Sequence, residues 1–443
     1  MSYYKYSIVT MNIKILSIIS VVFLLLTLFT GCFGDSEQIN HKPVVVINYP
    51  SNNAIVSGFV MISGVSSDAD GDEDIEFVEV KINDQAWKKA DGILQWSFHW
   101  NTYEYEDGKY SVSVRAWDSL EYSDVKTIHV EVRNPEHVDS DAHRWALFVA
   151  AANFPLDNAS KLGNGGLFLA EEMAEYLVKE CGYATSNIII LFDDGWIRDN
   201  NGYGEKIMTL QQRNTKYAFT YSSATKEMVE LSINYIIDQS NKYRESEVFM
   251  WFFSHGYGDM SDSLTGGKLL ESSHIFLWDD IINDKKLGEW LDPLNSKRVC
   301  IIIDACFSGG FADKTILNIP TSRLFRSGIP RAGRVVIAGA SKFRVGYAST
   351  TRGPLFSLLW FEGLKTGNAD GFGQGLFNRG RPRRLNIFKD GKVSVEEAFY
   401  YARYILSTEE YLQDYNTMEP QMNDRYPHPG LFFSRKGLVL GQD

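Results

Sequence analysis

Two residues of reactive type, His255 and Cys306, stand at corresponding places in the sequence. His255 comes two residues after the apolar run 248–253, and Cys306 comes three residues after the apolar run 299–303. A cysteine reacts as its thiolate, and a neighbouring imidazole can take the thiol proton. Taken singly, such a cysteine is usually part of a core and such a histidine usually caps a strand. Together they predict acyl transfer with Cys306 as nucleophile and His255 as base.

The backbone beside these side chains adds hydrogen-bond donors. Gly256 offers an unobstructed N–H, and together with the N–H of Cys306 it is predicted to bind the oxyanion of an acyl-transfer reaction. Cys300 lies inside an apolar strand and Cys181 at a helix end, so both are interpreted as unreactive core thiols. Four cysteines without a CxxC pair argue against a disulfide scaffold and against a thiolate zinc site.

Apolar strands alternate with amphipathic helices in the part of the chain that carries these residues. Strands are expected at 145–151, 188–192, 248–253 and 299–303, and helices at 166–181 and 226–240. Continuous apolar strands between helices predict an α/β domain, with a mostly parallel sheet that has helices on both faces. Ligand sites of such sheets lie beyond the carboxyl ends of the strands, where His255 and Cys306 stand. This domain is expected to span 143–436, with a tail at 437–443.

The motifs Ser254-His255-Gly256 and Asp304-Ala-Cys-Phe-Ser-Gly309 resemble those of the caspase–legumain group of cysteine peptidases. The resemblance extends over about 144–433, where 334–341 is similar to the strand that carries pocket residues in that group, and 353–357 to the start of a later helix. It implies a caspase-like fold and endopeptidase activity through an acyl-enzyme, without a cofactor.

The same resemblance addresses substrate choice. Asp304 matches the carboxylate that faces the basic side chain of the substrate in arginine- and lysine-specific relatives, a contact that suits a bidentate guanidinium. The alternative, which stays open, is that Asp304 only caps loop N–H groups. The resemblance places Ser341 in the same pocket. Legumains carry an Arg-His pair where this chain has 164–166, Asn-Gly-Gly, which puts asparagine specificity in doubt.

The first 34 residues have the features of a lipoprotein signal peptide. The apolar run 15–29 follows Lys14 and precedes small residues, and it is shorter than the roughly 20 residues that span a bilayer. Residues 28–32 resemble a lipobox, in which Cys32 would be lipidated. The alternative is an uncleaved signal anchor. Both interpretations place the remaining chain outside the cytoplasm, anchored to the membrane and held away from it by a tether at 35–42.

Residues 43–133 are expected to form an all-β sandwich of immunoglobulin type, joined to the α/β domain by a linker at 134–142. Short alternating strands are expected at 44–47, 60–62, 78–82, 110–114 and 128–132. This region resembles immunoglobulin-like modules of bacteria and archaea that space an enzyme from its anchor or bind surface ligands.

Two acidic segments raise the question of calcium. Asp68, Asp70 and Asp72 alternate in one loop, but the glycine there falls in the wrong position for an EF-hand, so a solvated acidic loop is the favoured interpretation. Asp390 and Glu397 occupy two positions of a second EF-hand-like segment, where a turn before a helix is favoured instead. Calcium is therefore kept as the alternative interpretation of both segments.

The charge balance bears on the partners. Against 44 Lys and Arg the chain has 56 Asp and Glu, a net charge of -12, which argues against a nucleic-acid partner because phosphate binding needs a basic face. The expected partners are a protein or peptide substrate and a membrane. Two alternative functions stay open, a transpeptidase with the same acyl-enzyme and an inactive surface-binding protein that works through its β-sandwich.

Overall fold

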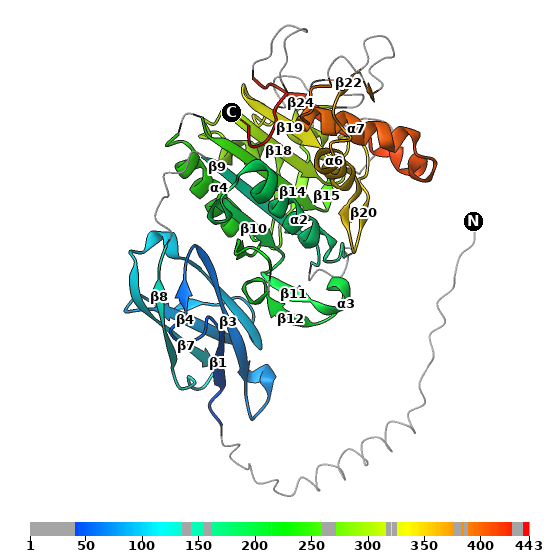
Figure 1. Ribbon diagram of the computed structural model, residues 1–443. Coiled ribbons are helices and arrows are strands. Elements are labelled where there is room, and N and C mark those ends of the chain that lie inside the picture. Colours follow the sequence, from blue (N-terminus) through cyan, green and yellow to red (C-terminus); the bar gives the residue numbers. More distant parts are fainter. Residues whose placement is uncertain are drawn as a thin grey trace, which may run out of the picture.

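The computed structural model of the protein describes residues 40–134, 143–154, 161–213, 215–243, 245–258, 272–315, 320, 326–374, 382–384, 389–427 and 437–442. They form an N-terminal β-sandwich and a larger α/β domain, shown in blue to cyan and in green to red in Figure 1. Residues 1–39, which include the predicted signal peptide 1–34 with Cys32 and most of the predicted tether, lie outside the described residues. Helices long and apolar enough to cross a bilayer are absent from the described part of the chain.

The N-terminal domain is a two-sheet sandwich. One sheet has the order β1-β3-β6 and the other β2-β8-β7-β4-β5. Alternate residues of β4, such as Val78 and Val80, point inward and pack with Trp96 in the core between the sheets. The strands predicted from the sequence are confirmed; the full set is β1 (Val44–Tyr49), β2 (Ile55–Val56), β3 (Phe59–Ser67), β4 (Phe77–Ile82), β5 (Lys88–Lys89), β6 (Gln95–Asn101), β7 (Gly108–Trp117) and β8 (Lys126–Val132).

The α/β domain is built on a seven-stranded sheet with the order β13-β10-β9-β14-β18-β19-β24. Its strands pair in parallel except β24, which runs antiparallel to β19. The mostly parallel sheet is thus confirmed. Its strands are β9 (Arg144–Ala151), β10 (Ile188–Phe192), β13 (Thr220–Ser222), β14 (Glu247–Ser254), β18 (Arg298–Asp304), β19 (Arg334–Ala338) and β24 (Gln421–Asp424).

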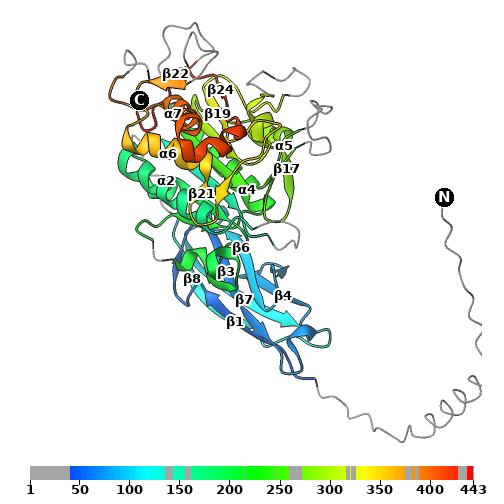
Figure 2. The same ribbon diagram turned by 90° about the vertical axis from the view of Figure 1, so that its right-hand side faces the viewer.

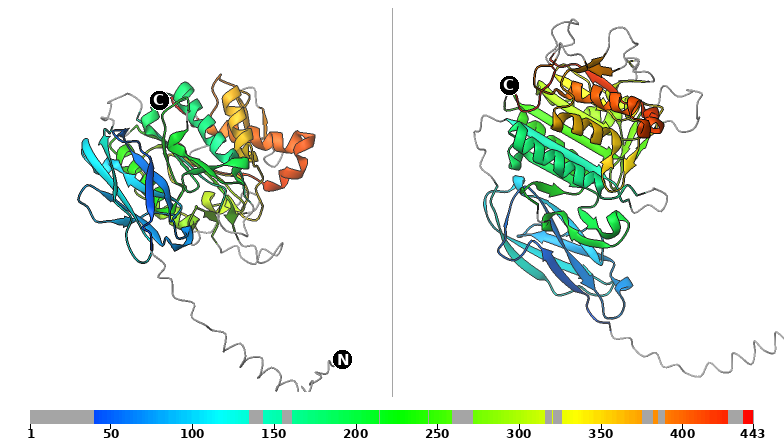
Figure 3. Two further views of the ribbon diagram at one scale, coloured as in Figure 1. Left: turned by 90° about the horizontal axis from the view of Figure 1, so that it is seen from below. Right: turned by 45° about the vertical axis from the view of Figure 1, so that its right-hand side comes forward.

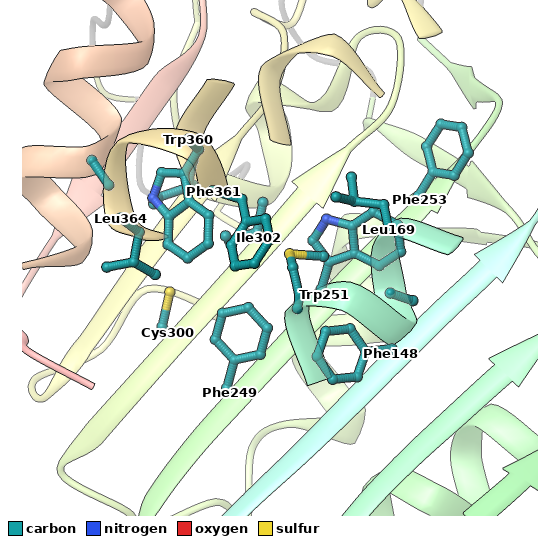
Figure 4. Close-up of a cluster of buried hydrophobic side chains, with 14 of the residues drawn as sticks. Phe148, Leu169, Phe249, Trp251, Phe253, Cys300, Ile302, Trp360, Phe361 and Leu364 are labelled. Atoms are coloured by element: carbon teal, nitrogen blue, oxygen red, sulfur yellow. The ribbon is translucent and has the colours of Figure 1, made fainter. Parts of the chain in front are cut away.

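Helices cover both faces of this sheet, because its central strands are apolar on both sides. On one face, Phe148 and Trp251 pack in a cluster with residues of α2 (Gly165–Cys181), α6 (Leu355–Thr366) and α7 (Val395–Thr408). Figure 4 shows part of this cluster between the sheet and two of the helices. On the other face, the cluster around Leu147 includes residues of α4 (Lys226–Ser240) and α5 (Asp284–Trp290). The views in Figures 1 and 2 show these layers.

Shorter elements lie around the sheet. A two-stranded sheet follows β10, and a three-stranded sheet follows His255. The shorter elements of the α/β domain are β11 (Trp196–Arg198), α3 (Asp199–Gly202), β12 (Lys206–Thr209), β15 (Gly256–Tyr257), β16 (His274–Phe276), β17 (Ile281–Asn283), β20 (Ala348–Ser349), β21 (Gly353–Pro354), β22 (Phe372–Gln374) and β23 (Pro382–Arg384).

The predicted ends of the domains need two corrections. Residues 437–442 are not a free tail, because Leu438 and Leu440 are buried in the α/β core and the N–H of Leu438 bonds the carboxylate of Glu396. The tether is shorter than predicted. Asn40 bonds Asp118 of the sandwich, so its last residues already belong to that domain.

Candidate functional site

The two candidate catalytic residues follow neighbouring strands at equivalent positions. Strands β14 and β18 pair in parallel, and their last paired residues are Phe253 and Asp304. His255 and Cys306 each come two residues later. Because the pairing is in register, both lie just beyond the same edge of the sheet, the carboxyl edge where the sequence placed them.

The backbones of the two motifs touch. A Cβ atom added to Gly256 would lie 1.9 Å from the carbonyl oxygen of Cys306 and 2.8 Å from its nitrogen. Only a glycine allows this approach. The N–H groups of Gly256 and of Cys306 act on the thiol, since both lower its pKa. The two donors predicted for an oxyanion are therefore together beside the sulfur.

The thiol of Cys306 lies in a partly buried position with further backbone contacts. The N–H of Gly346 donates to Sγ at 3.3 Å, and the thiol can donate to the carbonyl of the same residue at 3.7 Å. Burial raises the pKa of Cys306, and it outweighs the N–H groups that lower it. Burial thus favours the thiol form, and a base would assist its attack. Sequence reasoning missed Gly346, because nothing marks it among the glycines of the chain.

His255 stands between two aromatic side chains. The ring centroid of Phe154 is 5.9 Å from that of the imidazole, and the ring of Phe276 lies edge-on at 6.2 Å. The N–H of Phe276 donates to the carbonyl of His255 at 3.0 Å, which ties the motif to β16. Phe154 follows β9, the strand on the other side of β14. Neither aromatic residue was identified from the sequence, because both come close to His255 only in the folded chain.

Asp304 is buried, with 2% of its surface exposed. Its Oδ2 accepts hydrogen bonds from the N–H of Ser357 at 2.9 Å and from the hydroxyl of the same residue at 2.7 Å. Burial raises the pKa of Asp304 to about 6. The carboxyl group thus caps the first turn of α6, a helix rather than the loop that the sequence-based alternative named.

Ser341, the other predicted pocket residue, is fully buried. Its N–H donates to the carbonyl of Met418 at 2.8 Å, and its hydroxyl has no hydrogen-bond partner among the described residues. It lies next to the loop after the nucleophile, because a Cβ on Gly309 would come within 3.1 Å of its carbonyl carbon. The structure therefore brings Ser341 close to the Cys306 motif.

The loop after Cys306 is held by Ser273. The Ser273 hydroxyl donates to the carbonyl of Phe307 and accepts the N–H of Gly310 at 2.9 Å, while the Ser273 N–H donates to buried Asp284 at 3.0 Å. Phe307 has a positive φ of 57°. These bonds fix the sharp turn that follows Cys306.

The calcium candidates take part in hydrogen bonds within their own segments and with neighbouring residues. Among the described residues, no group of three His, Cys, Asp or Glu could hold a metal ion. In the sandwich, Asp70 contacts His41 at 2.8 Å, and the carboxylates of Asp68 and Asp72 accept N–H groups of their own loop. In the second segment, Asp390 accepts the N–H of Lys392, and Glu397 completes the capping box of α7. The favoured turn and loop interpretations agree with these contacts.

Comparisons with known proteins identify the sandwich. Residues 43–114 match the family model described as a bacterial Ig domain, so the predicted immunoglobulin-like domain is confirmed. A comparison with curated proteins gives no match.

Solved structures match parts of the chain at low identity and low TM-score. Caspase-1 from Spodoptera frugiperda is 13% identical, with a TM-score of 0.30 over 51% of this chain and 69% of that chain. A protein from Geobacter sulfurreducens is 17% identical, with a TM-score of 0.32 over 51% of this chain and 82% of its own. An endo-beta-1,4-mannanase from Thermotoga petrophila is 14% identical, with a TM-score of 0.20 over 23% of this chain. The chain spans only 22% of the mannanase, and none of these scores is high enough to support an argument about function.

Proposed function

We propose that the protein is a cysteine endopeptidase in which Cys306 is the nucleophile and His255 the base. The observation that carries this proposal is the register of β14 and β18. Phe253 pairs with Asp304, and His255 and Cys306 each come two residues after this pair. The converging N–H groups of Gly256 and Cys306 supply the charge stabilisation that acyl transfer requires. The α/β domain would then be of the caspase type.

In the proposed reaction, Cys306 Sγ transfers its proton to His255 and attacks the carbonyl carbon of a peptide bond. The electron pair of the carbonyl moves onto its oxygen, where the two N–H groups stabilise the charge. As this pair returns, the C–N bond breaks, and the leaving amine takes the proton from His255. Water then gives a proton to His255 and attacks the thioester carbonyl. The C–S bond breaks, the acid leaves, and the sulfur of Cys306 takes the proton back from His255.

Three variants test the assignment. We expect Cys306→Ala to abolish cleavage of a peptide library and His255→Ala to reduce it by about 10³-fold, since general base catalysis contributes on this scale. Cys300→Ala, which removes a buried thiol of β18, is the matched control and should retain activity. Full activity in Cys306→Ala would exclude the peptidase assignment.

We further propose that the enzyme cleaves after basic residues, with Asp304 and Ser341 in the pocket. Asp304 is a buried carboxyl group with a raised pKa, so an incoming guanidinium would favour its charged form. The test is to profile wild type and Asp304→Asn on peptides with Arg, Lys, Asn or Asp before the scissile bond. Loss of Arg and Lys cleavage alone supports the role. Wild-type cleavage confined to sites after Asn or Asp excludes it.

We also propose that the chain is anchored outside the cytoplasm through lipidated Cys32. The bacterial Ig domain is consistent with a surface protein. Wild type should partition into the detergent phase, whereas Cys32→Ser should be released or left unprocessed. A soluble chain that retains its first residues would contradict the anchor.

Two alternatives have defined readouts. A transpeptidase would pass the acyl group to an added amine, which mass spectrometry of the products would detect. An inactive surface-binding protein would leave Cys306 unlabelled by a thiol-reactive peptide inhibitor. Neither alternative is favoured by a specific contact in the site.

A further inference from the structure

The sandwich is packed against the α/β domain rather than held apart from it, as the views in Figures 1 and 3 agree. Phe59 of β3 is buried in the same hydrophobic cluster as Phe154 and residues of α4. Tyr103 of the sandwich stacks on Tyr235 of α4, with ring centroids 4.3 Å apart and planes at 13°. Side chains of the sandwich thus complete the core on one face of the sheet.

Two neighbouring side chains of the sandwich each contact a loop of the α/β domain. Met61 of β3 and His99 of β6 are cross-strand partners and so lie side by side. The sulfur of Met61 lies 2.2 Å from the position of a Cβ on Gly195, in the turn after β10. The imidazole of His99 bonds the hydroxyls of Ser222 at 3.2 Å and Ser223 at 2.9 Å, at the end of β13.

Both loops lead to Trp278. The carbonyl of Ala224, next to Ser223, accepts the N–H of Trp278 at 2.9 Å. From the other loop, Asp194 forms a bidentate ion pair with Arg198, whose guanidinium lies 5.0 Å from the centre of the indole ring. The backbone and the ring of Trp278 are therefore fixed from two directions, both of which begin at the sandwich.

Trp278 in turn reaches the catalytic base through one aromatic residue. The ring of Phe154 stacks on Trp278 at 6.1 Å with planes 14° apart, and its centroid is 5.9 Å from that of His255. A packed series of contacts thus runs from His99 to His255. Such a series transmits a displacement because packed interiors leave little room for side chains to relax.

On the basis of the proposed function, we propose that the sandwich positions the catalytic base, with Met61 and His99 setting the two loops that orient Trp278, Phe154 and His255. The sandwich is then part of the catalytic unit and not only the spacer or ligand-binding module that the sequence indicated. His99 and Phe154 are positioning residues in this scheme, because neither takes part in bond making. Misplacement of a catalytic group by a fraction of an ångström is enough to slow turnover.

The test uses the full chain with His99→Ala, Phe154→Leu and the double variant. His129→Ala is the matched control, since His129 is an exposed histidine of β8 in the same sandwich. We expect His99→Ala to lower kcat about tenfold with KM within about twofold, because the base is misplaced while substrate contacts remain. The double variant should be no slower than the slower single variant, because both substitutions act through one series of contacts.

A second readout separates positioning from loss of folded protein. Alkylation of Cys306 by iodoacetamide, mapped by mass spectrometry, should reach half its maximal rate at a higher pH in His99→Ala, because the misplaced His255 assists ionisation of the thiol less well. Wild-type kcat and an unchanged alkylation profile in His99→Ala would overturn the positioning role. A double variant whose loss of kcat equals the product of the two single losses would also overturn it. A wild-type protein without peptidase activity would instead overturn the proposed function itself, and this proposal with it.

Discussion

Gly256 lies against the backbone of Cys306 so closely that a single methyl group between them would overlap the carbonyl oxygen of the cysteine. This contact joins the segment that follows β14 to the segment that follows β18. It also keeps an N–H group of one motif beside the sulfur of the other. The spacing between these two residues therefore fixes both the shape of the site and its electrostatics.

We expect Gly256→Ala to disrupt the site. The added Cβ would lie 1.9 Å from a backbone atom, which cannot swing away as a side chain can, so β14 and β18 must move apart. Overpacking of this kind costs about 1–3 kcal/mol. Urea unfolding and peptide cleavage should both show the loss. For comparison, Gly346→Ala places its Cβ no closer than 3.5 Å to other atoms and should leave the free energy of unfolding near that of wild type. Wild-type stability of Gly256→Ala would contradict the contact.

Asp304 should make stability fall as pH rises from about 4 to 6. Burial raises the pKa of this carboxyl group from 3.8 to about 6 in the folded state, so the folded protein holds a proton that the unfolded chain releases. This contribution to the free energy of unfolding is complete below pH 3.8 and is lost as pH rises through 6. Its size is on the order of 3 kcal/mol. Asp304→Asn cannot ionise and should show a flatter dependence.

The comparison needs urea unfolding at pH 4.5 and 7.5 for three proteins, wild type, Asp304→Asn and Asp84→Asn. Asp84 is exposed and serves as the control, because its removal should leave the pH slope unchanged. Other buried carboxyl groups contribute to the slope of every protein, and the difference between wild type and variant isolates Asp304. Equal slopes for wild type and Asp304→Asn would show that the carboxyl group titrates normally.

Among Cys181, Cys300 and Cys306, only Cys306 should react with iodoacetamide in the native protein. Cys181 and Cys300 are buried, and burial raises the pKa of both thiols, that of Cys181 to about 12. Cys306 is partly exposed. Peptide mapping after brief alkylation should find Cys306 modified at least about tenfold faster than the others, since reactivity follows thiolate content and access. Modification of all three at one rate would indicate that the native core is open.

The strands and the reactive pair could be predicted from the sequence because their signals are local. Alternation marks the sandwich strands, and unbroken apolar runs mark β14 and β18, so that His255 and Cys306 stand out as the first polar turns. The contacts of Phe154, Gly346 and Trp278 with the site depend on long-range packing and leave no local pattern.

One signal for the domain interface was present in the sequence. Residues 59–62, Phe-Val-Met-Ile, form an unbroken apolar run within the sandwich, as residues 44–47 of β1 also do, although Val44 and Val46 are exposed. An unbroken run indicates a strand covered on both faces. One face of β3 packs in the sandwich core, and the other, with Phe59 and Met61, is covered by the α/β domain.

The last residues of the chain should prove to be part of the fold. Leu438 is fully buried, and its N–H donates to Glu396, a buried carboxyl group whose pKa burial raises to about 8. We expect Leu438→Ala to lower the free energy of unfolding by about 3 kcal/mol, the usual cost of truncating a buried leucine. Val439→Ala, at a less buried neighbour, should cost less than about 1 kcal/mol. Urea unfolding measures both variants, and equal stability of wild type and Leu438→Ala would contradict the packing of this segment.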